Sequence, residues 1–113
     1  MRPESPPSFR QQDLFGGHGI VDIWNMRTMN CPPFSATLWC SLEPGGYVGR
    51  HRQQDDPEIV ICLSGEGIAT IGKSPHQLIR GSMVYLPLGQ VLSIRNSSED
   101  TSLEYLIIKA KVT

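Results

Sequence analysis

Three polar side chains lie close together in the middle of the chain, at a spacing that suits one site. His51 and Gln53 are two residues apart, so on an extended strand both side chains point to the same face. Glu58 follows on the next expected strand, which can bring its carboxylate to the same space. An imidazole, an amide and a carboxylate that converge in a dry interior suit a divalent transition metal or acid–base chemistry.

Short strands separated by turn residues must position these side chains. Eleven glycines and nine prolines divide the 113 residues into short segments, which favours an all-β fold. The turn over residues 64–67 predicts that the flanking strands pair as a hairpin. About eight strands with short turns indicate a sandwich or a small barrel. The expected strands span residues 20–24, 35–42, 58–63, 68–71, 77–79, 83–86, 91–95 and 103–109.

Composition excludes several classes of function. Ten basic residues face 11 acidic ones, so the net charge is −1, and no basic field exists to hold a nucleic acid or an anionic membrane. The longest apolar run, residues 59–63, is too short to span a bilayer. Residues 1–7 lack the apolar core of a secretory signal. Three cysteines without a close pairing motif indicate reduced thiols and a cytoplasmic location.

The length predicts one folded unit preceded by a short arm. Residues 1–12 are polar and rich in proline, which predicts an extended and partly mobile segment. Phe9 and Phe15 are the side chains expected to pin this arm to the body. Residues 13–113 are then a single domain, because a chain of 113 residues has no room for a second one.

Two segments of the chain carry a family resemblance. Residues 45–65 read G-x5-H-x-Q-x4-E-x6-G, and residues 81–96 read G-x5-P-x-G-x2-L-x3-N. This spacing resembles the two motifs of the cupin superfamily, and in particular the small single-domain cupins of uncharacterised function. The resemblance implies an all-β double-stranded β-helix, a jelly-roll barrel whose interior is the pocket.

The chain departs from the cupin pattern at two of the four metal-ligand positions. Gln53 stands where the family has its second histidine, and Leu92 stands where it has its last. The resemblance therefore leaves His51, Gln53 and Glu58 as a reduced ligand set. A neutral amide is a weak ligand and leucine is none, so either one divalent ion (Fe, Mn, Ni, Cu or Zn) binds loosely or no metal binds.

Further residues are expected around this pocket. Cys62 lies four positions after Glu58 and shares its inward face, either as a soft ligand or as a small buried hydrophobic side chain. Gln90 lies two positions before Leu92, so a regular strand there adds a second amide to the pocket. Tyr85 faces either the pocket or the outer surface.

Two functional classes remain open, with a third, structural one. The first is a binding protein with a degenerate metal site, whose ligand is small and partly apolar with one or two polar groups. The second is an enzyme. It is either a metal-dependent oxygenase or isomerase with fewer ligands, or a metal-free isomerase or cyclase that uses His51 as the acid or base and Glu58 to orient it. In the third, His51 and Glu58 form a buried pair inside an inert, filled barrel.

Two expected strands are apolar on both faces. In residues 59–63, the side chains of both faces are apolar. The same holds for residues 103–108, apart from Glu104. Because one face of an antiparallel sheet normally meets water, something must cover the second face. A partner subunit or the N-terminal arm is the expected cover, and we predict a homodimer.

Overall fold

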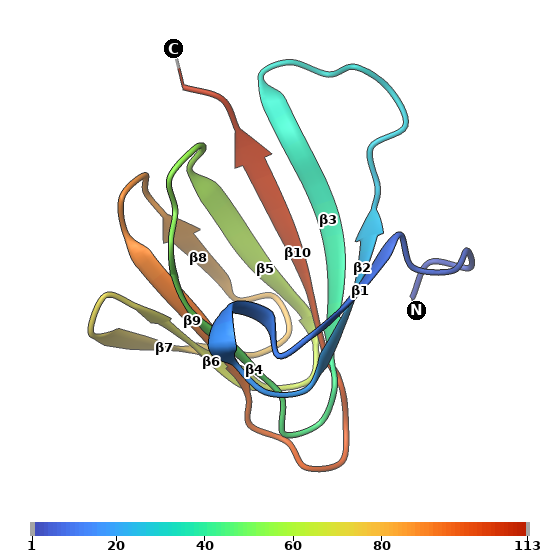
Figure 1. Cartoon of the computed structure of the whole chain (residues 1–113), viewed down its shortest axis with the longest axis vertical. Coiled ribbons are helices and arrows are strands. Elements are labelled where there is room, and N and C mark those ends of the chain that lie inside the picture. The colour runs from blue at the N-terminus through green and yellow to red at the C-terminus, as the bar shows by residue number, and fades with distance from the viewer. Residues whose placement is uncertain (1, 113) are drawn as a thin grey trace.

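A computed structural model describes residues 2–112 as two antiparallel β-sheets that face each other around one core (Figure 1). The larger sheet has the strand order β1-β2-β3-β10-β5-β8, and the smaller has the order β4-β9-β6-β7. The one helical element within residues 2–112 is a short 3-10 turn, η1 (Leu14–Gly16). No helix there is long and apolar enough to cross a membrane. The strands are β1 (Phe9–Gln12), β2 (Ile20–Asn25), β3 (Phe34–Leu42), β4 (Tyr47–Arg52), β5 (Glu58–Ser64), β6 (Gly67–Ile71), β7 (Ser74–Leu78), β8 (Met83–Leu86), β9 (Val91–Asn96) and β10 (Leu103–Ala110).

The all-β jelly-roll prediction is confirmed, and alternation along the strands decides what fills the core. On β3, Leu38, Cys40 and Leu42 point inward, and Trp39 and Ser41 point outward. Both sheets contribute buried apolar side chains between the layers. The largest fully buried side chains are those of Val21, Cys40, Leu42, Val60, Cys62, Leu78, Leu86, Leu92, Ile94 and Leu103.

The predicted hairpin between residues 58–63 and 68–71 is wrong. β5 pairs with β10 and β8, whereas β6 pairs with β7 and β9 in the other sheet. The turn between them therefore carries the chain from one sheet to the other. Gly65 adopts a φ of 86° in this turn, and a Cβ on Gly67 would lie 2.4 Å from the carbonyl oxygen of Arg95. These two glycines permit a crossing that a sequence pattern cannot distinguish from a hairpin.

Sequence patterns miss two strands. β1 is exposed along its whole length, so it shows no alternation of apolar and polar residues. β4 contains Gly49, a poor strand former. A Cβ at Gly49 would lie 2.0 Å from the carbonyl oxygen of Phe15, so the glycine lets η1 pack directly against this strand.

The N-terminal arm lies along the outer face of the larger sheet. The indole nitrogen of Trp24 donates to the Ser5 carbonyl at 2.8 Å, and the Arg2 guanidinium pairs with Glu104 at 3.3 Å. The Ser8 hydroxyl also accepts a hydrogen bond from a backbone amide of β2. The arm therefore covers part of the outer face of the larger sheet, where the apolar side chains of β5 and β10 are expected to need a cover.

One end of the barrel is closed by a buried asparagine. The Asn96 amide nitrogen donates to the carbonyls of Leu42, Glu43 and Thr101, and its oxygen accepts from the Ser98 backbone amide. These bonds tie the β3–β4 connection to the β9–β10 connection, which lie together at the bottom of Figure 1. The opposite end of the barrel, where the β4–β5 connection lies, remains open.

Candidate functional site

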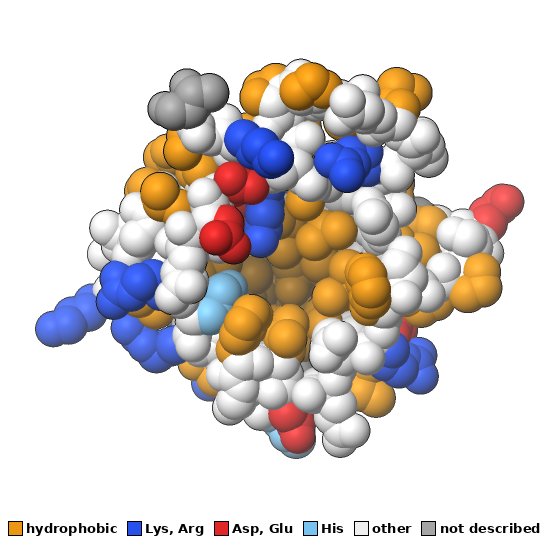
Figure 2. Space-filling view, turned by 45° about the horizontal axis from the view of Figure 1, so that its top comes forward, with side chains coloured by type: hydrophobic (Ala, Val, Ile, Leu, Met, Phe, Trp, Pro, Cys, Tyr) orange, Lys and Arg blue, Asp and Glu red, His pale blue; other side chains and the backbone are white. Residues whose placement is uncertain are grey.

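The open end of the barrel leads into a cavity of about 630 Å³. This volume lies within the range of about 300–1,000 Å³ that is usual for small-molecule sites. Figure 2 shows the hollow with an apolar floor and with charged and histidine side chains on one side. The apolar lining consists of Phe9, Leu14, Phe15, Val21, Ile23, Leu38, Cys40, Val48, Leu92, Ile94, Tyr105 and Ile107. The polar lining consists of Gln11, His51, Arg52, Gln53, Gln54, Asp55, Glu58 and Lys109.

His51 lies near the end of β4, where it pairs in register with Leu92 of β9. Its Nδ1 atom lies 2.9 Å from the Gly49 carbonyl oxygen. A carbonyl only accepts hydrogen bonds, so Nδ1 carries the proton and Nε2 is left as an acceptor. Burial lowers the pKa of His51, the Gly49 carbonyl opposes this shift, and the charge of Lys109 adds to it. The net effect favours the neutral form of the ring.

Phe15 holds the His51 ring from the side of η1. The two rings are stacked, with centroids 4.0 Å apart and an interplanar angle of 13°. Phe15 has a φ of 54°, a left-handed conformation that is strained for a residue with a side chain. This strained residue fixes the plane of the imidazole at the cavity wall.

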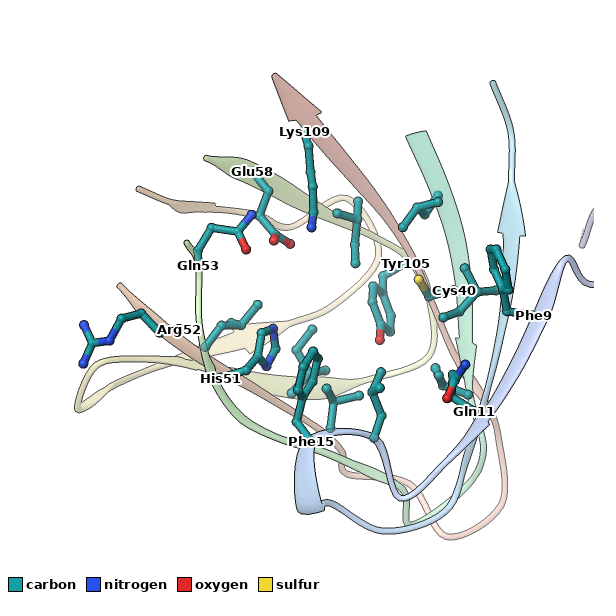
Figure 3. Close-up of a pocket in the computed structure, with 18 of the residues that line it drawn as sticks. Phe9, Gln11, Phe15, Cys40, His51, Arg52, Gln53, Glu58, Tyr105 and Lys109 are labelled. Atoms are coloured by element: carbon teal, nitrogen blue, oxygen red, sulfur yellow. The ribbon is translucent and has the colours of Figure 1, made fainter. Parts of the chain in front are cut away.

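Glu58 and Lys109 face the cavity from neighbouring strands. They are register partners on β5 and β10, and Figure 3 shows both side chains pointing into the cavity. Glu58 is only 4% exposed, yet within residues 2–112 its carboxyl group makes neither a hydrogen bond nor an ion pair, even with Lys109. Burial raises the pKa of Glu58, and the charge of Lys109 works against that shift.

Gln53 lies just beyond β4 and completes a polar wall, which we define as His51, Gln53, Glu58 and Lys109. Its amide nitrogen donates to the Asp56 carbonyl, which leaves the amide oxygen toward the cavity (Figure 3). Its backbone amide and carbonyl bond to the β8–β9 turn. The structure thus places His51, Gln53 and Glu58 together in the lining of one cavity.

Three other predicted pocket residues lie away from this cavity. Cys62 is buried in the core, and its thiol lies 3.7 Å from the Ser64 carbonyl. Tyr85 is 56% exposed and lies on the outer face of β8. Gln90 is exposed because it belongs to the turn before β9, so strand alternation does not extend to it from Leu92. Leu92 itself is buried and lines the cavity.

The sequence analysis did not place two residues of β10, Lys109 and Tyr105, in the cavity. Lys109 and Tyr105 both point inward because they alternate along β10 with Ile107 between them. That alternation is visible in the sequence, but the strand is apolar on both faces, so its inward side could not be assigned. Burial raises the pKa of Tyr105 well above its usual value and that of the neighbouring Cys40 to about 12. Both groups stay protonated.

The polar wall does not fit a tightly held transition metal. Residues 2–112 contain no cluster of three or more histidine, cysteine, aspartate or glutamate side chains placed to share an ion. His51 and Glu58 are the two strong donors, Gln53 adds a weak one, and Leu92 adds none. The ammonium group of Lys109 also faces the same space (Figure 3), and its charge opposes a bound cation.

Comparison with known proteins adds a family and several relatives. A family model described as a cupin domain matches residues 38–109. An oxalate-binding protein of Thermotoga maritima is 28% identical over 101 residues, which cover 88% of this chain and 83% of that protein. The solved structure of a predicted oxalate decarboxylase from T. maritima superposes with a TM-score of 0.88 at 24% identity, over 98% of this chain and 97% of the other. A cupin-like protein of T. maritima gives a TM-score of 0.80 at 22% identity, over 99% and 83%.

Replacing the Glu58 carboxyl group will stabilise the protein in a pH-dependent way. A carboxyl group whose pKa is raised by folding contributes stability below its unfolded pKa, and that contribution is lost as the pH rises through the folded pKa. Glu58→Gln should therefore raise the free energy of unfolding at pH 7 by about 1 kcal/mol, and by less at pH 4. Urea denaturation at both pH values measures this effect.

Glu66→Gln is the matched control, because Glu66 is exposed in the turn between β5 and β6. It should change the free energy of unfolding by less than about 0.5 kcal/mol at either pH. A gain for Glu58→Gln that is the same at pH 4 and pH 7 would contradict the assignment of a costly buried carboxylate.

Proposed function

This chain belongs to the cupin domain family, and we propose that it binds a small, partly apolar molecule in the open end of its barrel. The observation that carries this proposal is the Glu58 carboxyl group, whose oxygens face the cavity and make no hydrogen bond or ion pair within residues 2–112, although the residue is only 4% exposed. A buried carboxyl group without a partner costs stability, and a ligand that bonds to it recovers that cost. The relative named as an oxalate-binding protein supports small-molecule binding as the general class.

The same cavity argues against an inert, filled barrel. A barrel that serves only as a structural module is expected to be packed with side chains. Here a hollow of about 630 Å³ is lined on one side by His51, Gln53, Glu58 and Lys109. His51 and Glu58 also make no hydrogen bond to each other within residues 2–112, so the alternative of a self-satisfied pair has no support.

Metal-free acid–base catalysis is the second candidate function. The fixed His51 tautomer favours it, because Nε2 is unprotonated and burial keeps the ring neutral. The group that orients the ring is the Gly49 carbonyl, which leaves Glu58 free to bind the ligand. Solvent deuterium entering a bound ligand in the native protein but not in His51→Gln would establish this function; deuterium entering equally in both would dismiss it.

We propose that the metal site of this cupin is degenerate. Two of the family's ligand positions hold Gln53 and Leu92, and Lys109 adds a positive charge beside them. Cation affinity is therefore weakened both by missing donors and by repulsion. The ligand rather than a metal ion then engages the polar wall.

We also propose that a second copy of the chain covers the apolar part of the larger sheet's outer face. Alternation along β5 and β10 places apolar side chains on that face, beyond the part that the N-terminal arm covers. On the adjoining edge strand β8, Met83 and Tyr85 are 57% and 56% exposed. We further expect a cytoplasmic location, on the basis of the free cysteines.

A larger side chain in the cavity should weaken ligand binding. Leu38 lines the cavity from β3, and Leu38→Phe narrows it. Ring compounds from a fragment library that raise the melting temperature of the native protein should lose about tenfold or more in affinity for this variant. Leu88→Phe is the control, because Leu88 is exposed outside the cavity. Equal losses in both variants, or none in Leu38→Phe, would place the binding site elsewhere.

Metal content tests the degenerate site directly. The untagged protein, purified without chelator, should contain far less than one equivalent of Fe, Mn, Ni, Cu or Zn by elemental analysis. Restoring both missing ligands with Gln53→His and Leu92→His should raise the content toward one equivalent. A stoichiometric metal in the native protein that is lost in Glu58→Ala would contradict the proposal and favour a metal-dependent oxygenase or isomerase.

Light scattering tests the second copy. The native protein at micromolar concentration should give twice the monomer mass of 12.5 kDa. Met83→Lys places a charge on the apolar face and should shift the mass toward the monomer, whereas Leu88→Lys should not. A monomeric mass for the native protein would contradict this proposal.

A further inference from the structure

The hydrogen-bonding groups of the polar wall are mostly acceptors once their protein partners are counted. His51 has already used its Nδ1 proton on the Gly49 carbonyl, so it offers the Nε2 lone pair. Gln53 uses one of its two amide N–H donors on the Asp56 carbonyl, and its amide oxygen is free to accept. Glu58 offers carboxyl oxygens that bond to nothing within residues 2–112. Three acceptors therefore line one side of the cavity.

We infer that the natural ligand is a neutral molecule that presents two neighbouring hydroxyl groups from an apolar ring to His51, Gln53 and Glu58. This inference rests on the proposed function and adds the ligand's chemical class. Each hydroxyl group donates one hydrogen bond and accepts others. Two adjacent hydroxyl groups thus donate to two of the three acceptors of the wall and still accept from the ammonium group of Lys109 (Figure 3).

Charge on the wall argues against the two other classes of polar ligand. A small dicarboxylate such as oxalate has only acceptors, so it would place two negative charges beside Glu58, with Lys109 as the one cation of the polar wall to balance them. Arg52, the other basic residue of the lining, points away from the polar wall and donates to the Gly89 carbonyl (Figure 3). An ammonium ligand would donate to the acceptors, but it would lie in the same space as Lys109 and be repelled by it. A neutral donor avoids both penalties.

The rest of the cavity requires an apolar body of ring size. Leu38, Val48, Leu92 and Ile107 belong to the apolar lining of the cavity, and the Phe15 ring stacks against His51. A molecule as small as oxalate would leave this apolar surface in contact with water. A ring that covers it gains roughly 25 cal/mol for each Å² of apolar surface buried.

A matched set of probes tests the inference by calorimetry. Benzene-1,2-diol carries two neighbouring hydroxyl groups, and 1,2-dimethoxybenzene is the same ring with acceptors only. Benzoate and oxalate supply the anionic cases. Titrations of the native protein are made without oxygen, so that the diol is not oxidised, and with chelator, so that stray metal ions cannot hold it. We expect the diol to bind at least about tenfold more tightly than each of the other three.

The variant Glu58→Gln separates a hydroxyl-binding wall from simple apolar uptake. It keeps the size of the side chain but replaces one acceptor with a donor, so the affinity for benzene-1,2-diol should fall at least about tenfold. The affinity for 1,2-dimethoxybenzene should not fall. Glu66→Gln makes the same chemical change at an exposed position and should leave both affinities unchanged.

The outcomes distinguish this inference from the proposed function. Binding of 1,2-dimethoxybenzene, benzoate or oxalate as tightly as the diol, with losses in Leu38→Phe, would overturn the hydroxyl inference and leave the binding cavity in place. Diol binding that Glu58→Gln does not weaken would overturn the role of the polar wall. Failure of all four probes to bind the native protein would overturn both proposals.

Discussion

The register of β10 between β3 and β5 decides which side chains meet in the cavity. This strand is apolar on both faces, and a shift of one residue would exchange its inward and outward sets. In the observed register, Tyr105 lies beside Cys40 and Cys62, and Lys109 lies beside Glu58. The one ammonium group of the polar wall, and the floor beneath it, therefore depend on backbone pairing between strands that are distant in the sequence.

The polar wall lowers the stability of the folded protein, and it does so at positions where a bound ligand would restore that stability. Glu58 is a largely buried residue whose carboxyl oxygens face the cavity without a partner within residues 2–112, and Phe15 holds a left-handed conformation to stack on His51. Strain and unsatisfied polar groups of this kind concentrate at functional sites, because the surrounding structure holds them in place. Asn96 at the closed end is, by contrast, well satisfied by bonds that hold two connections of the fold together.

Some residues of the two motifs shape the backbone of the barrel, and others line its cavity. Gly65 and Asn96 perform backbone tasks, a left-handed turn and a set of carbonyl bonds, that do not depend on a metal. Gln53 and Leu92 occupy positions where other cupins have ligands, yet the barrel forms around them. The same fold can therefore keep its structure while its chemistry changes.

The sequence by itself determined the fold class and the region of the site. Turn residues predicted a sandwich or small barrel, and the resemblance of two motifs to those of the cupins implied a jelly roll. A two-residue separation placed His51 and Gln53 near each other, with Glu58 within reach. Local patterns could not decide that β5 and β6 lie in different sheets, because a turn between two strands reads the same in a hairpin as in a crossing. They also could not place Tyr85 and Gln90 outside the cavity. Only the tertiary structure brought Lys109 and Phe15 to the wall, because strand register and the close approach of η1 to Gly49 are contacts between distant parts of the chain.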